Sequence, residues 1–168
     1  ELNLPIIKNI DDGFLEYNKR LKKIYAPKLE SVGREFLLNN KQLTELDLPS
    51  LKTVGTNFVS RNTIITKFNA PLLERAGLGF LRDNLGLTIL ELPSLRWLAD
   101  YSLRYNVSLS KLYVPKLEEI GCDCLTRNRN LIELDLPNVR IIDHNFLQDN
   151  KDLAQFNAPK LEKIASGV

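Results

Sequence analysis

The sequence predicts a repeat solenoid, a chain wound as a right-handed stack of 22-residue coils with a parallel sheet of short strands on one side. Three observations predict this fold. Apolar residues recur in columns with a 22-residue period, one asparagine column runs through seven successive units, and all the prolines share the same spacing. The prolines are Pro5, Pro27, Pro49, Pro71, Pro93, Pro115, Pro137 and Pro159. A fixed period of this length is the signature of a solenoid, which needs at least three repeats.

Each unit begins with the pattern L-x-x-L-x-L, as in Leu43, Leu46 and Leu48. The final alternation of this pattern places apolar side chains on one face of a short strand. A proline follows at once. Because proline has no N–H to donate to a sheet, it predicts the point at which the strand ends.

The second half of each unit turns the chain back toward the next strand. Gly33, Gly55, Gly77 and Gly121 follow an Ile/Val column, where we expect a left-handed or tight backbone at a bend. A phenylalanine column then points into the stack, and the short remainder predicts turns or short helical segments on this side. The phenylalanines are Phe14, Phe36, Phe58, Phe80 and Phe146.

The asparagine column is expected to be structural. Its members are Asn18, Asn40, Asn62, Asn84, Asn106, Asn128 and Asn150. A side-chain amide offers donors and an acceptor, so each should turn inward and bond the backbone of its own and the adjacent coil. The alternative is a ladder of glycans or ligands. Only Asn106-Val107-Ser108 carries the glycosylation pattern, which makes that alternative weak.

The combined pattern L-x-x-L-x-[LA]-P-x-L-x-x-[IV]-G-x-x-F-L-x-x-N resembles the BspA-like class of leucine-rich repeat. The resemblance covers the whole chain, with asparagine where cysteine is common in the class, and with Ser102 and Cys124 at two phenylalanine positions. It implies an α/β-type leucine-rich-repeat solenoid. Members are mostly bacterial or protist surface and secreted binding proteins. The resemblance therefore implies a protein-interaction or ligand-display module, in an adhesion or host-interaction factor at the bacterial surface or secreted.

Composition narrows the classes of partner. The 168 residues carry a net charge of +2 with acids and bases interspersed, which argues against nucleic acid and against a polybasic membrane contact. No apolar run approaches the roughly 18 residues of a membrane-spanning helix. There is no methionine, and the first residues already belong to a repeat. We therefore expect residues 1–168 to form one domain of about seven and a half repeats, cut from a longer protein.

Longer periods lie over the 22-residue repeat. One column alternates in charge from coil to coil, which would bring opposite charges together and penalise a slip in register. Its members are Lys8, Glu30, Lys52, Glu74, Arg96, Glu118, Arg140 and Glu162. Residues 24–81 and 112–168 are also similar in sequence. For example, both contain the segment Glu-Leu-Asp-Leu-Pro, beginning at Glu45 and at Glu133. This similarity indicates growth by duplication of blocks of two and then four repeats.

The candidate binding residues alternate with the core residues of the strands and should face outward on a concave sheet. They are Tyr25, Asp47, Asn69, Glu91, Tyr113, Asp135, Lys23, Lys67 and Lys111. Repeat proteins use such extended faces for binding, and tyrosine is enriched at hot spots. Tyr25 and Tyr113 would lie about 19 Å apart, four strand spacings. The expected ligand is a protein partner. The alternative is a spacer domain whose sheet face is merely solvated.

Two further clusters need an interpretation. Trp97, Tyr101 and Tyr105 lie near the two missing phenylalanines, so Trp97 or Tyr101 should fill the space left by Ser102 and Cys124, unless the cluster forms an exposed convex patch. Asp100, Cys122 and His144 share one column in successive coils, which could make a thiol or metal site.

The rest of that column argues for a plain surface position. It holds Asp12, Arg34, Thr56 and Leu78. We therefore expect no enzyme, no catalytic residue, no metal and no cofactor. The bare apolar ends of the stack also predict end-to-end self-association.

Overall fold

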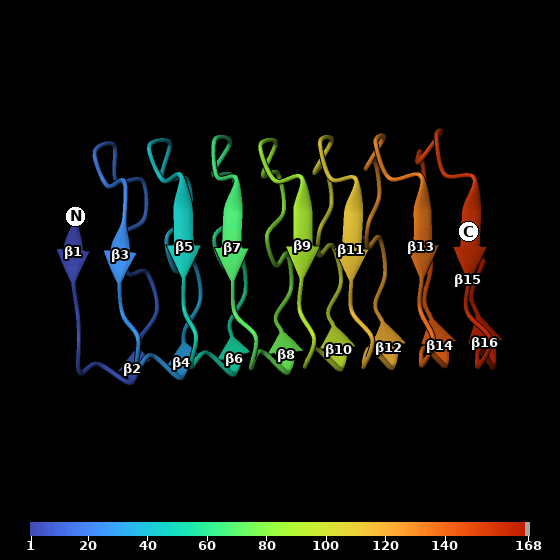
Figure 1. Ribbon diagram of the computed structural model, residues 1–168, viewed down its shortest axis with the longest axis horizontal. Helices are drawn as coiled ribbons and strands as arrows, with labels where there is room; N and C mark the ends of the chain where they lie inside the picture. The colour runs from blue at the N-terminus through green and yellow to red at the C-terminus, as the bar shows by residue number, and fades with distance from the viewer. Residues whose placement is uncertain (167–168) are drawn as a thin grey trace.

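The computed structural model describes residues 1–166 and shows a β-solenoid of 22-residue coils (Figure 1). Each coil contributes two short parallel strands followed by a run of turns. The predicted fold class is confirmed, and of the two forms expected for the remainder of each coil, turns are the ones present. Residues 1–166 contain no helix, and hence none that is long and apolar enough to cross a membrane.

The first strand of each coil lies in one row, which we name the first sheet; it is the upper row of arrows in Figure 1. Its strands are β1 (Leu2–Asn3), β3 (Ile24–Tyr25), β5 (Glu45–Asp47), β7 (Lys67–Asn69), β9 (Ile89–Glu91), β11 (Lys111–Tyr113), β13 (Glu133–Asp135) and β15 (Gln155–Asn157). Each paired residue faces the one 22 positions on, as in Leu46 and Phe68. The proline follows the strand as predicted.

The second strand of each coil was not expected. These strands form a second, eight-stranded parallel sheet: β2 (Asn9–Ile10), β4 (Ser31–Val32), β6 (Thr53–Val54), β8 (Arg75–Ala76), β10 (Trp97–Leu98), β12 (Glu119–Ile120), β14 (Ile141–Ile142) and β16 (Lys163–Ile164). A strand of two residues has one outward and one inward side chain, so it is too short to show an alternating pattern. Only the stacking of neighbouring coils makes it a strand.

The two sheets differ in continuity. The second sheet is paired along all eight strands, whereas the first is fully paired only within successive pairs of coils, such as β5 with β7 and β9 with β11. At the end of these strands an extra N–H···O bond joins the same pairs of coils: the residue before proline donates to the next coil. Its donors are Leu4, Leu48, Leu92 and Leu136. In the described chain, Ala26, Ala70 and Val114 make no such bond.

The third side of the stack consists of turns with an alternating backbone. Three residues in a typical coil, such as Glu35, Leu37 and Asn39, have φ between 55° and 58°. Their N–H groups donate to neighbouring coils: Leu37 to the carbonyl of Phe14, and Glu35 and Asn39 to the carbonyls of Thr56 and Ser60. Left-handed conformations cost energy in residues with a Cβ. Here they orient three N–H groups per coil along the stack, so this side is hydrogen-bonded without a β-sheet.

The glycines after the Ile/Val column lie where neighbouring coils approach closely, as the tight bend predicted, but they are not left-handed. None of Gly33, Gly55, Gly77 and Gly121 has a positive φ, so the left-handed expectation is wrong. They are glycine because coils approach closely: a Cβ on Gly55 would lie 2.6 Å from the carbonyl carbon of Gly33, and one on Gly77 2.5 Å from the oxygen of Gly55. The left-handed residues come a few positions later.

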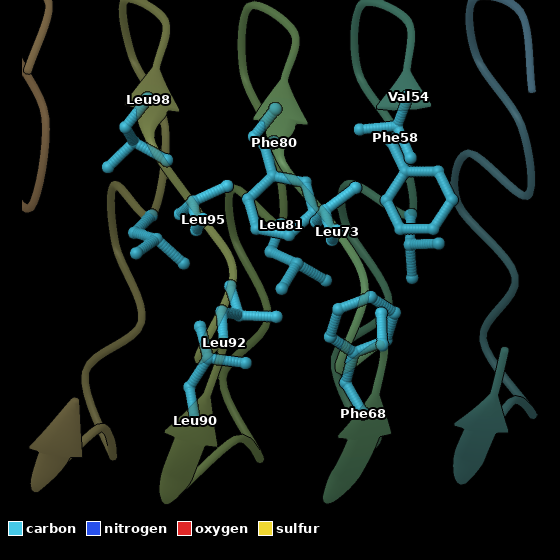
Figure 2. Close-up of a cluster of buried hydrophobic side chains, with 14 of the residues drawn as sticks. Val54, Phe58, Phe68, Leu73, Phe80, Leu81, Leu90, Leu92, Leu95 and Leu98 are labelled. Atoms are coloured by element: carbon cyan, nitrogen blue, oxygen red, sulfur yellow. The ribbon is translucent and has the colours of Figure 1, made fainter. Parts of the chain in front are cut away.

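The core is a continuous column of apolar side chains inside the coils. Phe36, Phe58 and Phe80 are fully buried and stack with ring centroids 5.6 and 5.7 Å apart. Phe68 from β7 meets the Phe58 and Phe80 rings edge-on, at 5.7 and 5.9 Å. Figure 2 shows the rings of Phe58, Phe68 and Phe80 among the leucines of the adjoining coils. Coils are thus joined by side-chain stacking as well as by backbone bonds.

The expectation that Trp97 or Tyr101 fills the interior near Ser102 and Cys124 is wrong. Ser102 and Cys124 are themselves fully buried, whereas Trp97 is 41 % and Tyr101 36 % exposed. Ser102 and Cys124 turn their polar atoms to the backbone, with Cys124 Sγ 3.1 Å from the carbonyl of Ala99. Trp97 belongs to the second sheet and Tyr101 to the turns that follow it, and the alternative of an exposed convex patch stays a prediction.

Candidate binding surface

The first-sheet face, meaning the outward side chains of the first-sheet strands, presents the nine predicted binding residues together. Eight of them lie on β3, β5, β7, β9, β11 and β13, and Lys23 directly precedes β3. In each of these strands the residue next to them, such as Ile24 or Leu46, is apolar and buried. Tyr25 is 59 % and Tyr113 50 % exposed. Because equivalent residues are in register, they occupy two parallel rows along the stack, with both tyrosines in one row. The face is a ready-made platform of exposed rings and charges.

Several polar groups of this face already bind one another. Asn69 donates to Asp47 Oδ1 at 2.7 Å, and Asn157 donates to Asp135 Oδ1 at the same distance. Lys23 forms an ion pair with Glu45, and this hydrogen bond lowers the pKa of the Glu45 carboxyl. These contacts hold the side chains in place and leave the tyrosine rings in water. The face is therefore ordered before any ligand arrives.

Shallow grooves follow the same face. One of about 340 Å³ is lined by β1, β3 and β5 and includes Tyr25 and Asp47. Another of about 680 Å³ is lined by β11, β13 and β15 and includes Tyr113 and Asp135. Such open grooves suit an extended chain or a protein surface better than an enclosed small molecule.

The asparagine column lies behind this platform, inside the stack. Asn40, Asn62, Asn84, Asn106 and Asn128 are fully buried. Each of these five backbone N–H groups donates to the Oδ1 of the asparagine in the next coil, at 2.5–2.9 Å. Most side-chain amides also donate to a carbonyl of the preceding coil, as Asn84 does to Val59 at 3.0 Å.

The two outer asparagines are only half-buried. Asn150 keeps the link to the preceding coil, but Asn18 instead accepts from the N–H groups of Arg20 and Leu21 in its own turn. The ladder therefore runs from Asn40 to Asn150 and does not extend to Asn18.

Comparison with known families matches residues 1–75 and 81–168 to the BspA type leucine-rich repeat region, in six copies. The chain belongs to this family. Comparison with curated proteins found no match, and comparison with solved structures found none either. Membership confirms the resemblance drawn from the repeat pattern and makes the chain a repeat module of a protein-interaction family. The family match does not extend to a particular ligand.

In the shared column of this BspA-type module, Asp100 bonds the backbone of the next coil and the His144 ring faces Ser166. Asp100 Oδ1 accepts a hydrogen bond from the backbone N–H of Cys122 at 2.9 Å. In an earlier coil, Asp12 Oδ1 accepts one from the backbone N–H of Arg34 at 2.6 Å. Burial and the charge of Asp100 raise the pKa of the Cys122 thiol, which disfavours the reactive thiolate. Within residues 1–166, no three His, Cys, Asp or Glu side chains converge as a metal site. The carboxylates of this column instead bond the backbone of the coil stack.

Two further aromatic side chains lie away from the first-sheet face. Trp97 stands in register with Arg75 and Glu119 on the second sheet. Tyr105, on the turns, has the guanidinium groups of Arg104 and Arg127 at 5.1 and 4.9 Å from its ring centroid. Sequence reasoning missed this contact because Arg104 and Tyr105 are adjacent while Arg127 is 22 residues away. The 22-residue period was the signal that could have found this contact, because it makes Tyr105 and Arg127 neighbours in successive coils.

Proposed function

We propose that this module is a non-catalytic scaffold whose first-sheet face binds a protein partner. The observation that carries the proposal is the pair of exposed tyrosines, Tyr25 and Tyr113, held in one row of ordered polar side chains above open grooves. Aromatic rings in such a setting supply contact area at little entropic cost. Lys23, Lys67, Lys111, Asp47, Asn69, Glu91 and Asp135 would provide the polar rim.

The test is capture of partners by the purified module and its variants. The double variant Tyr25→Ala with Tyr113→Ala should lose the partners that the wild type retains, because both anchors are gone. Trp97→Ala is the matched control, since it removes an exposed ring from the second sheet and should leave capture unchanged. Unchanged capture by the double tyrosine variant would refute the proposal and favour the spacer alternative.

The cellular role that we propose is an adhesion or host-interaction factor displayed on, or secreted from, a bacterial cell. Support comes from the family alone, since repeat modules of this class present extended faces to other proteins. Antibodies raised against the module would detect it on intact cells or in culture medium. Detection only after lysis would contradict this setting.

We also propose that the 168-residue polypeptide associates end to end. Its last coil leaves Phe156 40 % and Ile164 47 % exposed, and its first leaves Leu2 and Leu4 partly exposed, whereas their counterparts Leu46 and Leu48 are buried. Burial of apolar surface drives such association. Sedimentation velocity at increasing concentration should show oligomers, and a monomer at all concentrations would contradict the proposal.

A further inference from the structure

The outward residues of the first-sheet face occur twice, four coils apart. The segments 23–78 and 111–166 are related by a shift of 88 positions. Five of their six outward first-sheet positions are identical: Lys23 and Lys111, Tyr25 and Tyr113, Glu45 and Glu133, Asp47 and Asp135, Asn69 and Asn157. Only Lys67, which becomes Gln155, differs. We call these two sets the first and second subsites.

The remaining exposed surface of the same two segments has diverged. On the second sheet and the turns, most exposed positions change in size, polarity or charge. Examples are Arg34 to Cys122, Thr53 to Ile141, Arg61 to Asp149, Ile64 to Asp152, Leu72 to Lys160 and Leu78 to Ser166. The exceptions are Lys28, Glu30 and Glu74, matched by Lys116, Glu118 and Glu162, and the positive charges of Lys41, Lys52 and Arg75, kept by Arg129, Arg140 and Lys163. Duplication alone would leave all faces equally similar. Identical residues are concentrated on the first-sheet face. This concentration indicates that a function constrains the residues of that face more than those of the other faces.

The two subsites are also alike in three dimensions. Both tyrosines are about half exposed, and in both subsites the asparagine donates to the aspartate at 2.7 Å. Open grooves also follow both subsites, although they are offset by one coil: the first groove runs along β1, β3 and β5 and the second along β11, β13 and β15. The exposed tyrosine and the asparagine–aspartate hydrogen bond are therefore repeated at two places on one face.

From this duplication we infer that the module binds a repetitive partner through two equivalent subsites. The subsites are related by translation along the stack, by about 19 Å over four strand spacings. A partner that fills both must repeat its own contacts by the same translation. An extended polypeptide, at about 3.3 Å per residue, covers that distance in roughly six residues. The partner is thus an extended chain whose contact residue recurs about every six positions.

The chemistry of each subsite selects a basic contact residue. The first subsite holds two carboxylates and two lysines, whereas the second keeps both carboxylates but has Gln155 in place of Lys67. In each subsite the aspartate, Asp47 or Asp135, accepts from a neutral asparagine and forms no ion pair within residues 1–166. Tyr25 and Tyr113 add exposed ring faces beside this aspartate. A lysine or arginine side chain can pair with a carboxylate and lie over a tyrosine ring. This inference rests on the proposed binding role of the first-sheet face.

The experiment uses peptides selected on the module itself. A random library of about 16 residues, long enough extended to span roughly 50 Å, would be panned on the 168-residue chain. Selected peptides should carry lysine or arginine about six residues apart. A full-length selected peptide should bind by calorimetry at one per chain, and its half-length version, with one basic residue, at two per chain. Linking two contacts raises affinity through effective concentration, so the full-length peptide should bind at least tenfold more tightly.

Single variants separate this inference from the proposed function. Tyr25→Ala and Tyr113→Ala should each weaken the full-length peptide at least tenfold and reduce the half-length stoichiometry from two to one. If one of them abolishes binding and the other has no effect, the face binds at a single site and the inference is overturned while the proposed function survives. If neither variant has any effect, both fail.

Discussion

The two sheets of this solenoid are built from the same coils, yet they behave differently along the stack. The second sheet is paired strand after strand from β2 to β16, whereas the first is fully paired only within successive two-coil units. The residue before proline alternates between a leucine, such as Leu48, and a small residue, such as Ala70. The leucine coils are the ones whose N–H bonds the next coil. A 44-residue period in core size thus accompanies a 44-residue period in the sheet.

The difference in pairing indicates that the two sheets have different roles. The alternating charge column lies beside the second sheet, one residue before each strand, with ion pairs such as Glu30 to Lys52 at 2.8 Å and Arg96 to Glu118 at 2.6 Å. This regular row favours one register. The first sheet is less uniform and carries the tyrosines and grooves. The second sheet keeps the coils in register, and the first sheet carries the candidate binding face.

The largest effect should come from the asparagine ladder that both sheets share. Asn84→Ala removes the acceptor of the Asn62 N–H and the donor to the carbonyl of Val59. Leaving buried polar groups without partners should lower the free energy of unfolding by roughly 2–4 kcal/mol, measured by urea denaturation. Asn69→Ala, on the exposed face, is the control and should cost far less. Equal losses would show that the ladder does not hold the coils together.

A swap of core size tests the two-coil period itself. Leu48→Ala should cost about 2–5 kcal/mol, and Ala70→Leu about 1–3 kcal/mol through overpacking. If leucine size sets the pairing, the amide of residue 48 in Leu48→Ala should exchange hydrogen as fast as that of Ala70 in the wild type. Val54→Ala, in the second sheet, is the control and should leave this amide protected. If the residue 48 amide stays protected from exchange in Leu48→Ala, the size of the core residue does not cause the two-coil period of the first sheet.

Charge reversal should change the free energy of unfolding by a smaller amount, and differently for the two sheets. Glu118 stands between Arg96 and Arg140 in the charge column of the second sheet. Glu118→Lys should lower the free energy of unfolding by about 0.5–1 kcal/mol at low salt, with most of the loss recovered at high salt. Glu91→Lys, between Asn69 and Tyr113 on the first sheet, should cost almost nothing. A similar loss for both variants would contradict the assigned roles.

Acid should weaken both sheets slightly. Hydrogen bonds to lysine or arginine lower the pKa of Glu30 and Glu162 beside the second sheet and of Glu45 on the first, below the ordinary 4.5. A lowered folded-state pKa stabilises the protein above about pH 4.5, and the contribution is lost as pH falls through the folded-state value. The urea midpoint should therefore decrease below pH 4.5. A midpoint that rises in this range would contradict the ion pairs.

The repeat made most of the fold predictable from the sequence. Once Pro49 and Pro71 define one period, residues 22 positions apart become neighbours, which places Tyr25 and Asp47 side by side without further information. What escaped prediction depends on backbone geometry within a coil. The two-residue second strands and the left-handed Leu37 have no pattern of their own, because stacking neighbours impose them. Trp97 was misplaced for the same reason, since its direction depends on an unrecognised strand.

The most direct test of the division between binding and stacking sheets is a hydrogen-exchange footprint. The module would be measured alone and saturated with a peptide selected on it. We predict that protection on binding is confined to the first sheet, around Tyr25 and Tyr113, and that the amides around Trp97 on the second sheet are unchanged. Protection centred on Trp97 or on the turns near Tyr105 would contradict the account.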